Sequence, residues 1–206
     1  EKGILLKSNV QRTIARISLQ QKLLNNRLEL GITAANQVSK SGNVPFRNIV
    51  LSQMLTYLPT VPVRNADGSY YENFSRGGYF NPVSIIDNAT EEAKSSVFLG
   101  VFTAKAKLPF GFTYHLSYSY QGSNYMSGSY YNEYYTEHYR DIRIVPEPGN
   151  NTGNYHFLSG ENGVASRSTS KSNDQLLETY LDWNKKFNDH AIDVVLGYSY
   201  QKNTSE

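Results

Sequence analysis

The 206-residue sequence predicts an all-β fold, a segment of an antiparallel transmembrane β-barrel with about six long strands in three hairpins. Three observations favour this fold. Polar and apolar residues alternate along several stretches, these stretches come in pairs separated by short turns, and much longer segments join the pairs. Alternation with a period of two is typical of a strand whose two faces meet different surroundings.

The first predicted hairpin covers residues 12–34. From Arg12 to Leu23 the odd positions are mostly apolar and the even positions mostly polar, with two interruptions. After Asn25-Asn26 the alternation resumes, with the apolar residues now at even positions. Two alternating runs on either side of an Asn-Asn pair predict a hairpin with a tight turn.

The second predicted hairpin begins at about Ser96, turns at Pro109-Phe110-Gly111 and returns along residues 112–121, FTYHLSYSYQ. The returning stretch alternates with unusual strictness, with aromatic residues and leucine on one face and small or polar residues on the other. The third hairpin starts with residues 176–187, turns at Asn188-Asp189 and returns as HAIDVVLGYSYQ, which nearly repeats that pattern.

Two long segments, residues 39–92 and 123–173, join the hairpins. In the first, apolar residues recur at helical spacing from Phe46 to Leu58, between two prolines, which predicts one short loop helix. In the second, residues 146–154 and 166–173 have the composition of exposed loop.

The alternation of short and long connections favours a membrane barrel over a soluble sheet. Outer-membrane barrels have short periplasmic turns, long extracellular loops and an apolar outer band flanked by aromatic girdles. Aromatic residues lie near both ends of residues 112–120, a stretch that rises roughly 20 Å along a tilted barrel, close to the ~25 Å apolar band. The apolar faces are therefore predicted to contact lipid and the polar faces a wet lumen. The charged residues expected to face the lumen are Arg12, Arg16, Lys22, Glu29, Glu178 and Asp182.

Composition argues against several other functions. The formal net charge is +2 and the basic residues are scattered, so no nucleic-acid partner is expected. The chain has no cysteine, which excludes disulfides, thiolate metal sites and cysteine nucleophiles. Glu133, Glu137, His138 and Asp141 cluster in one loop, but their spacing matches no metal signature and predicts solvated charges. We therefore expect no catalytic residue, metal, cofactor or enzymatic activity.

Tyrosine is the unusual feature of the composition, with 17 residues, a density that suggests interfaces. Tyrosine rings stack on sugar rings, and tyrosine suits partly wet surfaces. The predicted substrate-binding residues are Tyr125, Tyr130, Tyr131, Tyr134 and Tyr135. The alternative is that these tyrosines belong to the outer aromatic girdle or pack the loops together.

Three stretches carry a family resemblance: PTVPVRNADGSYYENF at 59–74, NPVSIIDNATEEAKSSVFLGVFTAKAKL at 81–108 and LDWNKKFNDHAIDVVLGYSYQ at 181–201. They are similar to a loop with paired prolines and an acidic-Gly-Ser-Tyr turn, to an Asn-Pro-Val segment that leads into a Phe-Leu-Gly strand, and to a hairpin that ends in Gly-Tyr-Ser-Tyr-Gln. In this order they resemble the SusC/RagA family of TonB-dependent outer-membrane transporters of Bacteroidetes.

The resemblance implies that residues 1–206 are a piece from the middle of a single barrel domain of roughly 22 strands, without its internal plug domain. The parent protein would serve nutrient uptake, importing glycan or peptide oligomers across the outer membrane. Its partners would be a SusD-like surface lipoprotein, outer-membrane lipid, and TonB through parts of the parent protein outside this segment. Two alternatives remain: a small self-contained barrel that acts as an anchor or adhesin, and a soluble β-sandwich that binds carbohydrate.

Overall fold

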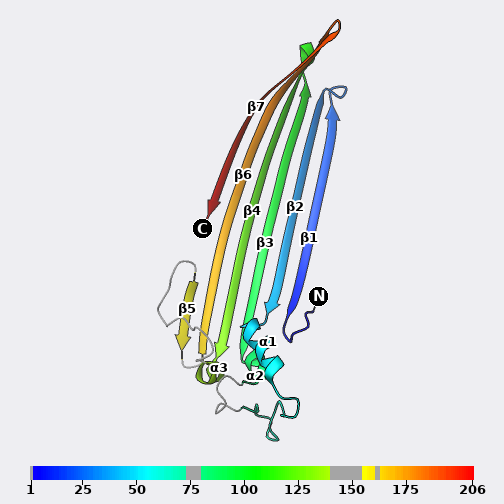
Figure 1. Ribbon diagram of the computed structural model, residues 1–206. Coiled ribbons are helices and arrows are strands. Elements are labelled where there is room, and N and C mark those ends of the chain that lie inside the picture. Colours follow the sequence, from blue (N-terminus) through cyan, green and yellow to red (C-terminus); the bar gives the residue numbers. More distant parts are fainter. Residues whose placement is uncertain (1, 73–79, 140–154, 161–162) are drawn as a thin grey trace. The chain divides into compact units, whose positions relative to one another are not determined.

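The computed structural model describes residues 2–72, 80–139, 155–160 and 163–206 (Figure 1). The chain is all-β with few helices, as the sequence predicts, and a 3₁₀ turn joins two of its strands. In chain order the elements are β1 (Asn9–Leu23), β2 (Leu28–Asn43), α1 (Arg47–Thr56), α2 (Pro82–Asp87), β3 (Ala89–Lys107), the 3₁₀ turn (Pro109–Gly111), β4 (Phe112–Asn132), α3 (Glu133–His138), β5 (Tyr155–Gly160), β6 (Gly163–Phe187) and β7 (His190–Ser205).

The described strands form one seven-stranded sheet in the order β1-β2-β3-β4-β6-β5, and β7 also pairs with β6. With 25 residues, β6 is long enough to pair antiparallel with two strands in succession. Its residues 163–168 pair with β5 and its residues 172–187 with β7. The six long strands are those that the alternation predicts, and β5 is an addition. A β-sandwich needs two packed sheets, whereas all strands in the described part belong to one.

The three short turns lie where the sequence predicts them. Positive φ angles, which most residues avoid, occur at residues 24–26, at Phe110 and Gly111, and at Asn188. A Cβ atom on Gly111 would lie 2.6 Å from the carbonyl oxygen of Asn184. The turn between β3 and β4 therefore needs both the left-handed backbone and the missing side chain of glycine.

Contacts between neighbouring strands confirm the two predicted faces. On the polar face of β1 and β2, Ser18 Oγ lies 3.0 Å from Thr33 Oγ1. On the apolar face of β4 and β6, the ring of Phe112 packs at 6.1 Å, centroid to centroid, from that of Trp183. These two contacts join side chains of like character, as expected for cross-strand pairs that share a face. Mixed contacts also occur, because the Tyr120 hydroxyl donates to Asn173 Oδ1 at 2.9 Å.

Strands β4 and β6 extend well beyond the predicted hairpin. The prediction of exposed loop for residues 166–173 is wrong, because these residues lie within β6. Small hydroxyl side chains support this part of the ladder; for example, Ser123 Oγ lies 2.7 Å from Ser172 Oγ. Hydrogen-bonded serine pairs stabilise adjacent strands without hydrophobic alternation, so the sequence pattern does not show them. Residues 146–154, also predicted as loop, lie outside the described residues.

The predicted loop helix is confirmed as α1, whereas α2 and α3 are additional. Each additional helix follows an asparagine whose side chain caps it. The side chain of Asn81 accepts from the N–H of Val83, and that of Asn132 from the N–H of Tyr135. Asparagine is a preferred cap and Pro82 suits the first helical position. With six residues each, these helices are too short to show a hydrophobic period.

The described residues fall into two compact units. The first comprises Glu1–Gln11, Ser39–Lys94 and Met126–Thr169, and the second Arg12–Val38, Ser95–Tyr125 and Ser170–Glu206. The buried hydrophobic side chains of the described chain all belong to the first unit, whereas the second consists of strands and turns whose side chains are half-buried or exposed.

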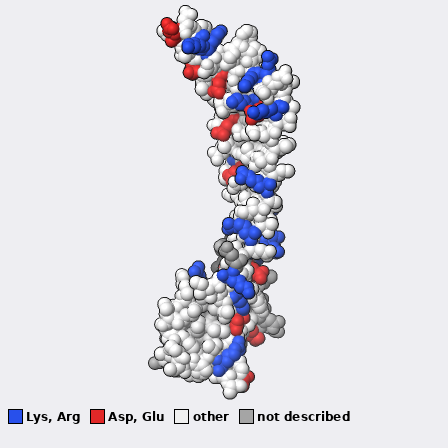
Figure 2. All heavy atoms as spheres, turned by 90° about the vertical axis from the view of Figure 1, so that its right-hand side faces the viewer, with Lys and Arg blue, Asp and Glu red and all other residues white. Residues whose placement is uncertain are grey.

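On the face that Figure 2 shows, Lys and Arg side chains are interspersed with acidic ones, in agreement with the scattered basic residues of the sequence. None of the described helices is long and apolar enough to cross a membrane.

Candidate functional site

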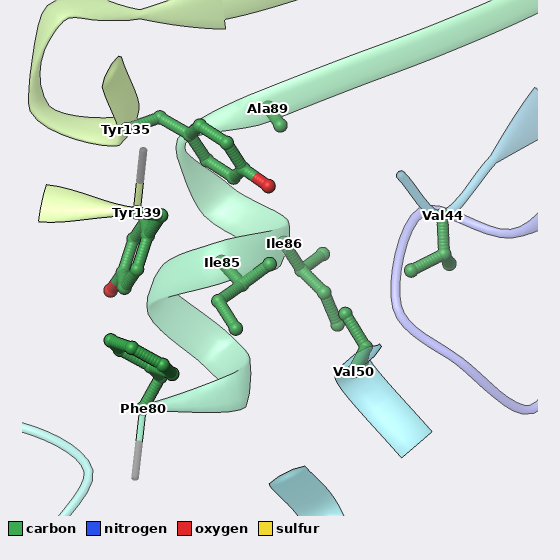
Figure 3. Packing of buried hydrophobic residues seen from close by; sticks show 8 residues of the cluster. All are labelled: Val44, Val50, Phe80, Ile85, Ile86, Ala89, Tyr135 and Tyr139. Carbon is green, nitrogen blue, oxygen red and sulfur yellow. The ribbon is translucent and has the colours of Figure 1, made fainter. Parts of the chain in front are cut away.

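A buried hydrophobic cluster lies in the first unit, at the three helices. Ile85 and Ile86 of α2 point into it, with Val50 of α1 beside Ile86 and the rings of Tyr135 and Tyr139 on the other side (Figure 3). We call the following eight residues the loop cluster: Val44, Val50, Phe80, Ile85, Ile86, Ala89, Tyr135 and Tyr139. Because burial of apolar surface stabilises a fold, the described parts of the connections after β2 and β4 form a packed layer here.

The segment before β1 is tied to the loop cluster by Lys7. Its ammonium group donates to the carbonyl oxygens of Ile86 at 2.8 Å and Asp87 at 3.1 Å. A lysine at a helix C-terminus satisfies the last carbonyl groups and is favoured by the negative end of the helix dipole. Lys7 therefore completes the end of α2, which has no basic residue of its own in its last turn.

A buried hydrogen-bond network lies beside the loop cluster. The Tyr139 hydroxyl donates to the Glu72 carboxylate and lies 2.6 Å from Ser84 Oγ. The second Glu72 oxygen accepts from the N–H of Asn81 at 3.2 Å. Burial, together with the hydrogen bond to Glu72, raises the pKa of Tyr139. The network joins the connection between α1 and α2 to both α2 and the end of α3.

We expect Tyr139→Phe to weaken the loop cluster by about 1–3 kcal/mol, because Glu72 and Ser84 lose a partner in a buried place. The raised pKa adds a pH dependence. The folded cluster favours the neutral hydroxyl, so its contribution to stability is fully present below the pKa of an unfolded tyrosine, about 10, and is lost as the pH rises through the folded pKa. Hydrogen exchange at α2 and α3 and tyrosinate absorbance in alkali measure the two effects.

Tyr57→Phe is the control for this variant. The Tyr57 hydroxyl donates to the carbonyl oxygen of Pro62 at 3.1 Å in an exposed position, where water replaces a lost partner. If Tyr57→Phe and Tyr139→Phe changed hydrogen exchange equally, the buried network would not stabilise the cluster.

The connection between α1 and α2 is ordered by local polar contacts. Asp67 accepts from the N–H and the hydroxyl of Ser69, and these hydrogen bonds hold the pKa of Asp67 below its usual value. Backbone hydrogen bonds between Asn65 and Ser69 and from Gly68 to Asn65 close a tight turn here. Arg64 lies 3.2 Å from the Asp87 carboxylate and 4.2 Å from the centre of the Tyr70 ring. Each of these exposed contacts stabilises little, but together they hold the connection beside α2.

The structure does not bring the five predicted substrate-binding tyrosines into one group. Tyr135 is fully buried in the loop cluster, and Tyr131 and Tyr134 are partly buried against it. Tyr125 and Tyr130, both in β4, are 47% and 45% exposed and belong to different units. The two exposed tyrosines are the ones with rings accessible to a ligand, and substrate binding stays a prediction for all five.

Sequence reasoning missed the side chains that order the first unit, which are Glu72, Asn81, Ser84 and Tyr139. One local signal was present, because Asn81-Pro82 has the residue types of a helix cap and a first helical position. The hydrogen bond between Glu72 and Tyr139 joins residues 67 positions apart. No spacing rule predicts such a pair.

The charged residues predicted to cluster in one loop lie at and just after α3. Among the residues that the structure describes, no group of three or more His, Cys, Asp or Glu side chains could hold a metal ion. Glu133 and His138 are the first and last residues of α3, and the His138 ring stacks on Tyr134 at 4.1 Å between centroids. Asp141 and the side chain of Glu137 lie outside the described residues.

On the polar face of β4 and β6, His115 contacts an aspartate and a tyrosine of β6. His115 Nε2 lies 2.9 Å from Asp182 Oδ2, and the imidazole stacks on the Tyr180 ring at 4.2 Å. Glu178 has the same parity in β6 as Asp182 and therefore shares this face. The same alternation places the other predicted lumen residues on the polar face of β1 and β2: Arg12, Arg16, Lys22 and Glu29.

A concavity of about 720 Å³ lies on the first unit. Residues of β1, β2, β3, β4 and β6 line it, and most of them are polar. Tyr130 is among them, and the charged side chains are Lys40, Lys94, Arg167 and Glu92. Its volume is within the range of small-molecule sites, about 300–1,000 Å³.

Comparison with known proteins shows a similarity to a TonB-dependent receptor. No family model matches the chain. Over 212 aligned residues the chain is 23% identical to the TonB-dependent receptor P3 of Formosa agariphila. The alignment covers 99% of this chain and 19% of that receptor, so the chain spans about a fifth of the length of this relative. The similarity supports a relationship to TonB-dependent receptors over nearly the whole chain.

Proposed function

We propose that the chain is a barrel segment of an outer-membrane TonB-dependent transporter of the SusC/RagA type, which imports glycan or peptide oligomers. The observation that carries the proposal is the similarity to a TonB-dependent receptor across 99% of the chain. The three family-like stretches at 59–74, 81–108 and 181–201 support the finer assignment to SusC/RagA. The proposal assigns the chain no catalytic role and no cofactor.

The sheet has the features that a barrel segment needs. Its strands are long and two-faced, with a polar pair, Ser18 and Thr33, on one face and an aromatic pair, Phe112 and Trp183, on the other. In the described part β1 pairs with β2 alone and β7 with β6 alone, so both present an open edge. Because an open edge leaves backbone groups without partners in lipid, closure would require further strands of the parent protein.

The loop cluster supports a role at the mouth of the barrel. In outer-membrane barrels the short turns are periplasmic and the long connections extracellular. On this basis the three short turns lie in the periplasm and the loop cluster lies outside the cell, where it forms part of a rim that meets substrate. A SusD-like surface lipoprotein is the proposed partner at this rim, and TonB would contact the parent protein outside this segment.

Uptake by cells tests the proposal. Cells that carry the parent gene should accumulate oligosaccharide or peptide oligomers only while TonB is active, and a deletion of the gene should abolish this uptake. If the protein were a self-contained anchor or adhesin, deletion of its gene or of TonB would leave uptake unchanged, and that result would overturn the proposal.

Tyrosine substitutions in the full-length protein test the binding role. Tyr130→Ala and Tyr125→Ala are each expected to weaken substrate binding about fivefold, equivalent to roughly 1 kcal/mol, through loss of an exposed aromatic ring. Tyr200→Ala removes an equally exposed ring from β7, outside the predicted site, and serves as the control. If all three variants bound substrate as the unaltered protein does, neither β4 tyrosine would contact substrate.

A further inference from the structure

The concavity on the first unit has a charge distribution that the transport proposal does not use. It lies across five strands, and three of its four charged lining residues are basic: Lys40, Lys94 and Arg167, with Glu92 as the acidic one. All four side chains are exposed, so they can reach a ligand without rearrangement of the backbone. We propose that this concavity binds a phosphate-bearing anion.

The basic residues converge from different strands. Lys40 comes from β2 and Lys94 from the neighbouring β3, while Arg167 comes from β6. An anion bound between like charges offsets their mutual repulsion. Among the described residues the ion pairs join Arg64 to Asp87 and His115 to Asp182, so none of the three bases forms an ion pair with a described carboxylate. Glu92 in the same concavity offsets one of their three positive charges.

The remaining lining supplies hydrogen-bond donors for phosphate oxygens, next to the apolar surfaces of Ala93, Met126 and the Tyr130 ring. Thr90 and the serines of β4 and β6 contribute hydroxyl groups, and Asn9 and Gln11 contribute amides. Hydroxyl and amide N–H groups donate hydrogen bonds to phosphate oxygens, while arginine binds them in pairs and lysine as a point charge. The volume of about 720 Å³ accommodates a diphosphate or a lipid headgroup.

Both sources of phosphate have the chemistry that the concavity recognises, and two probes separate them. The full-length protein in neutral detergent is titrated with inorganic pyrophosphate by calorimetry. The same protein in nanodiscs of phosphatidylcholine, with or without phosphatidylglycerol, is examined for enrichment of the anionic lipid at its surface. Pyrophosphate binding identifies a soluble phosphate as the ligand, and enrichment of phosphatidylglycerol alone identifies a lipid headgroup. Both interactions should weaken as ionic strength rises.

The decisive variant combines Lys40→Gln, Lys94→Gln and Arg167→Gln, with the single variant Lys94→Gln as a milder form. We expect the triple variant to bind the recognised probe at least about tenfold more weakly, because charge-assisted hydrogen bonds to phosphate are lost. The matched control, Lys105→Gln with Lys107→Gln and Lys202→Gln, removes the same charge from exposed strand positions outside the concavity and should bind within about twofold of the unaltered protein.

Three results would overturn this inference: neither probe binds, the concavity variants bind as tightly as the unaltered protein, or the control loses as much affinity as the triple variant. The last result would assign the attraction to net charge alone. The inference rests on the concavity and not on transport, so loss of phosphate binding would leave TonB-dependent uptake untouched, and absence of uptake would leave the phosphate site untouched.

Discussion

Replacing Ile85 by alanine is expected to lower the local free energy of unfolding of the loop cluster by about 2–5 kcal/mol, the usual cost of truncating a buried isoleucine. Ile85 is fully buried, and it lies in the short helix α2 between Val50 of α1 and the rings of Tyr135 and Tyr139. Truncation removes apolar contacts and leaves a cavity that a tightly packed layer fills only in part. Hydrogen exchange of the α1, α2 and α3 amides in the full-length protein measures the loss.

Leu55→Ala provides the matched control for Ile85→Ala. Leu55 belongs to α1 in the same unit, but it is 88% exposed, so its truncation removes few contacts. We expect a change within about 0.5 kcal/mol, as for most surface substitutions. If Ile85→Ala left the exchange rates of the three helices unchanged, the loop cluster would not be the structure that orders these connections.

Replacing Leu116 by arginine in the parent protein is expected to cost about 2–4 kcal/mol, the penalty for an arginine on the lipid face near the bilayer midplane. Leu116 lies in β4 on the face that carries Phe112, which packs against Trp183. This face contacts hydrocarbon under the proposed function, where a charged side chain has no water. The free energy of unfolding from lipid vesicles in denaturant measures the effect.

Ser117→Arg is the control for Leu116→Arg, because Ser117 is the next residue of the same strand and, like Leu116, is half-buried. Its side chain projects to the opposite, polar face, which also carries His115. An arginine in a wet lumen is solvated, so we expect a much smaller loss. Equal penalties at the two positions would mean that the lipid and lumen faces are not the ones assigned here.

Local sequence patterns predicted the six long strands, their alternating faces and the three short turns. Period-2 alternation is a local property, and so are the turn residues at Asn25-Asn26, Pro109 to Gly111 and Asn188-Asp189. The like-with-like contacts across β1 and β2 and across β4 and β6 confirm those faces. Helical spacing also identified α1, because ten residues are enough to show a period.

Three features depend on the packed fold: where the serine-rich strands end, which helices pack against the connections, and which tyrosines are buried. Residues 166–173 are a strand because their hydroxyls and backbone groups find partners on β4, not because of any pattern within the segment. Tyr135 is fully buried and Tyr130 is half exposed, although the two lie five positions apart in one tyrosine-rich run. Burial and long-range hydrogen bonds, such as that of Tyr139 with Glu72, depend on residues that are distant in the chain. Local spacing carries no information about such partners, so the sequence pattern does not show which residues form the site.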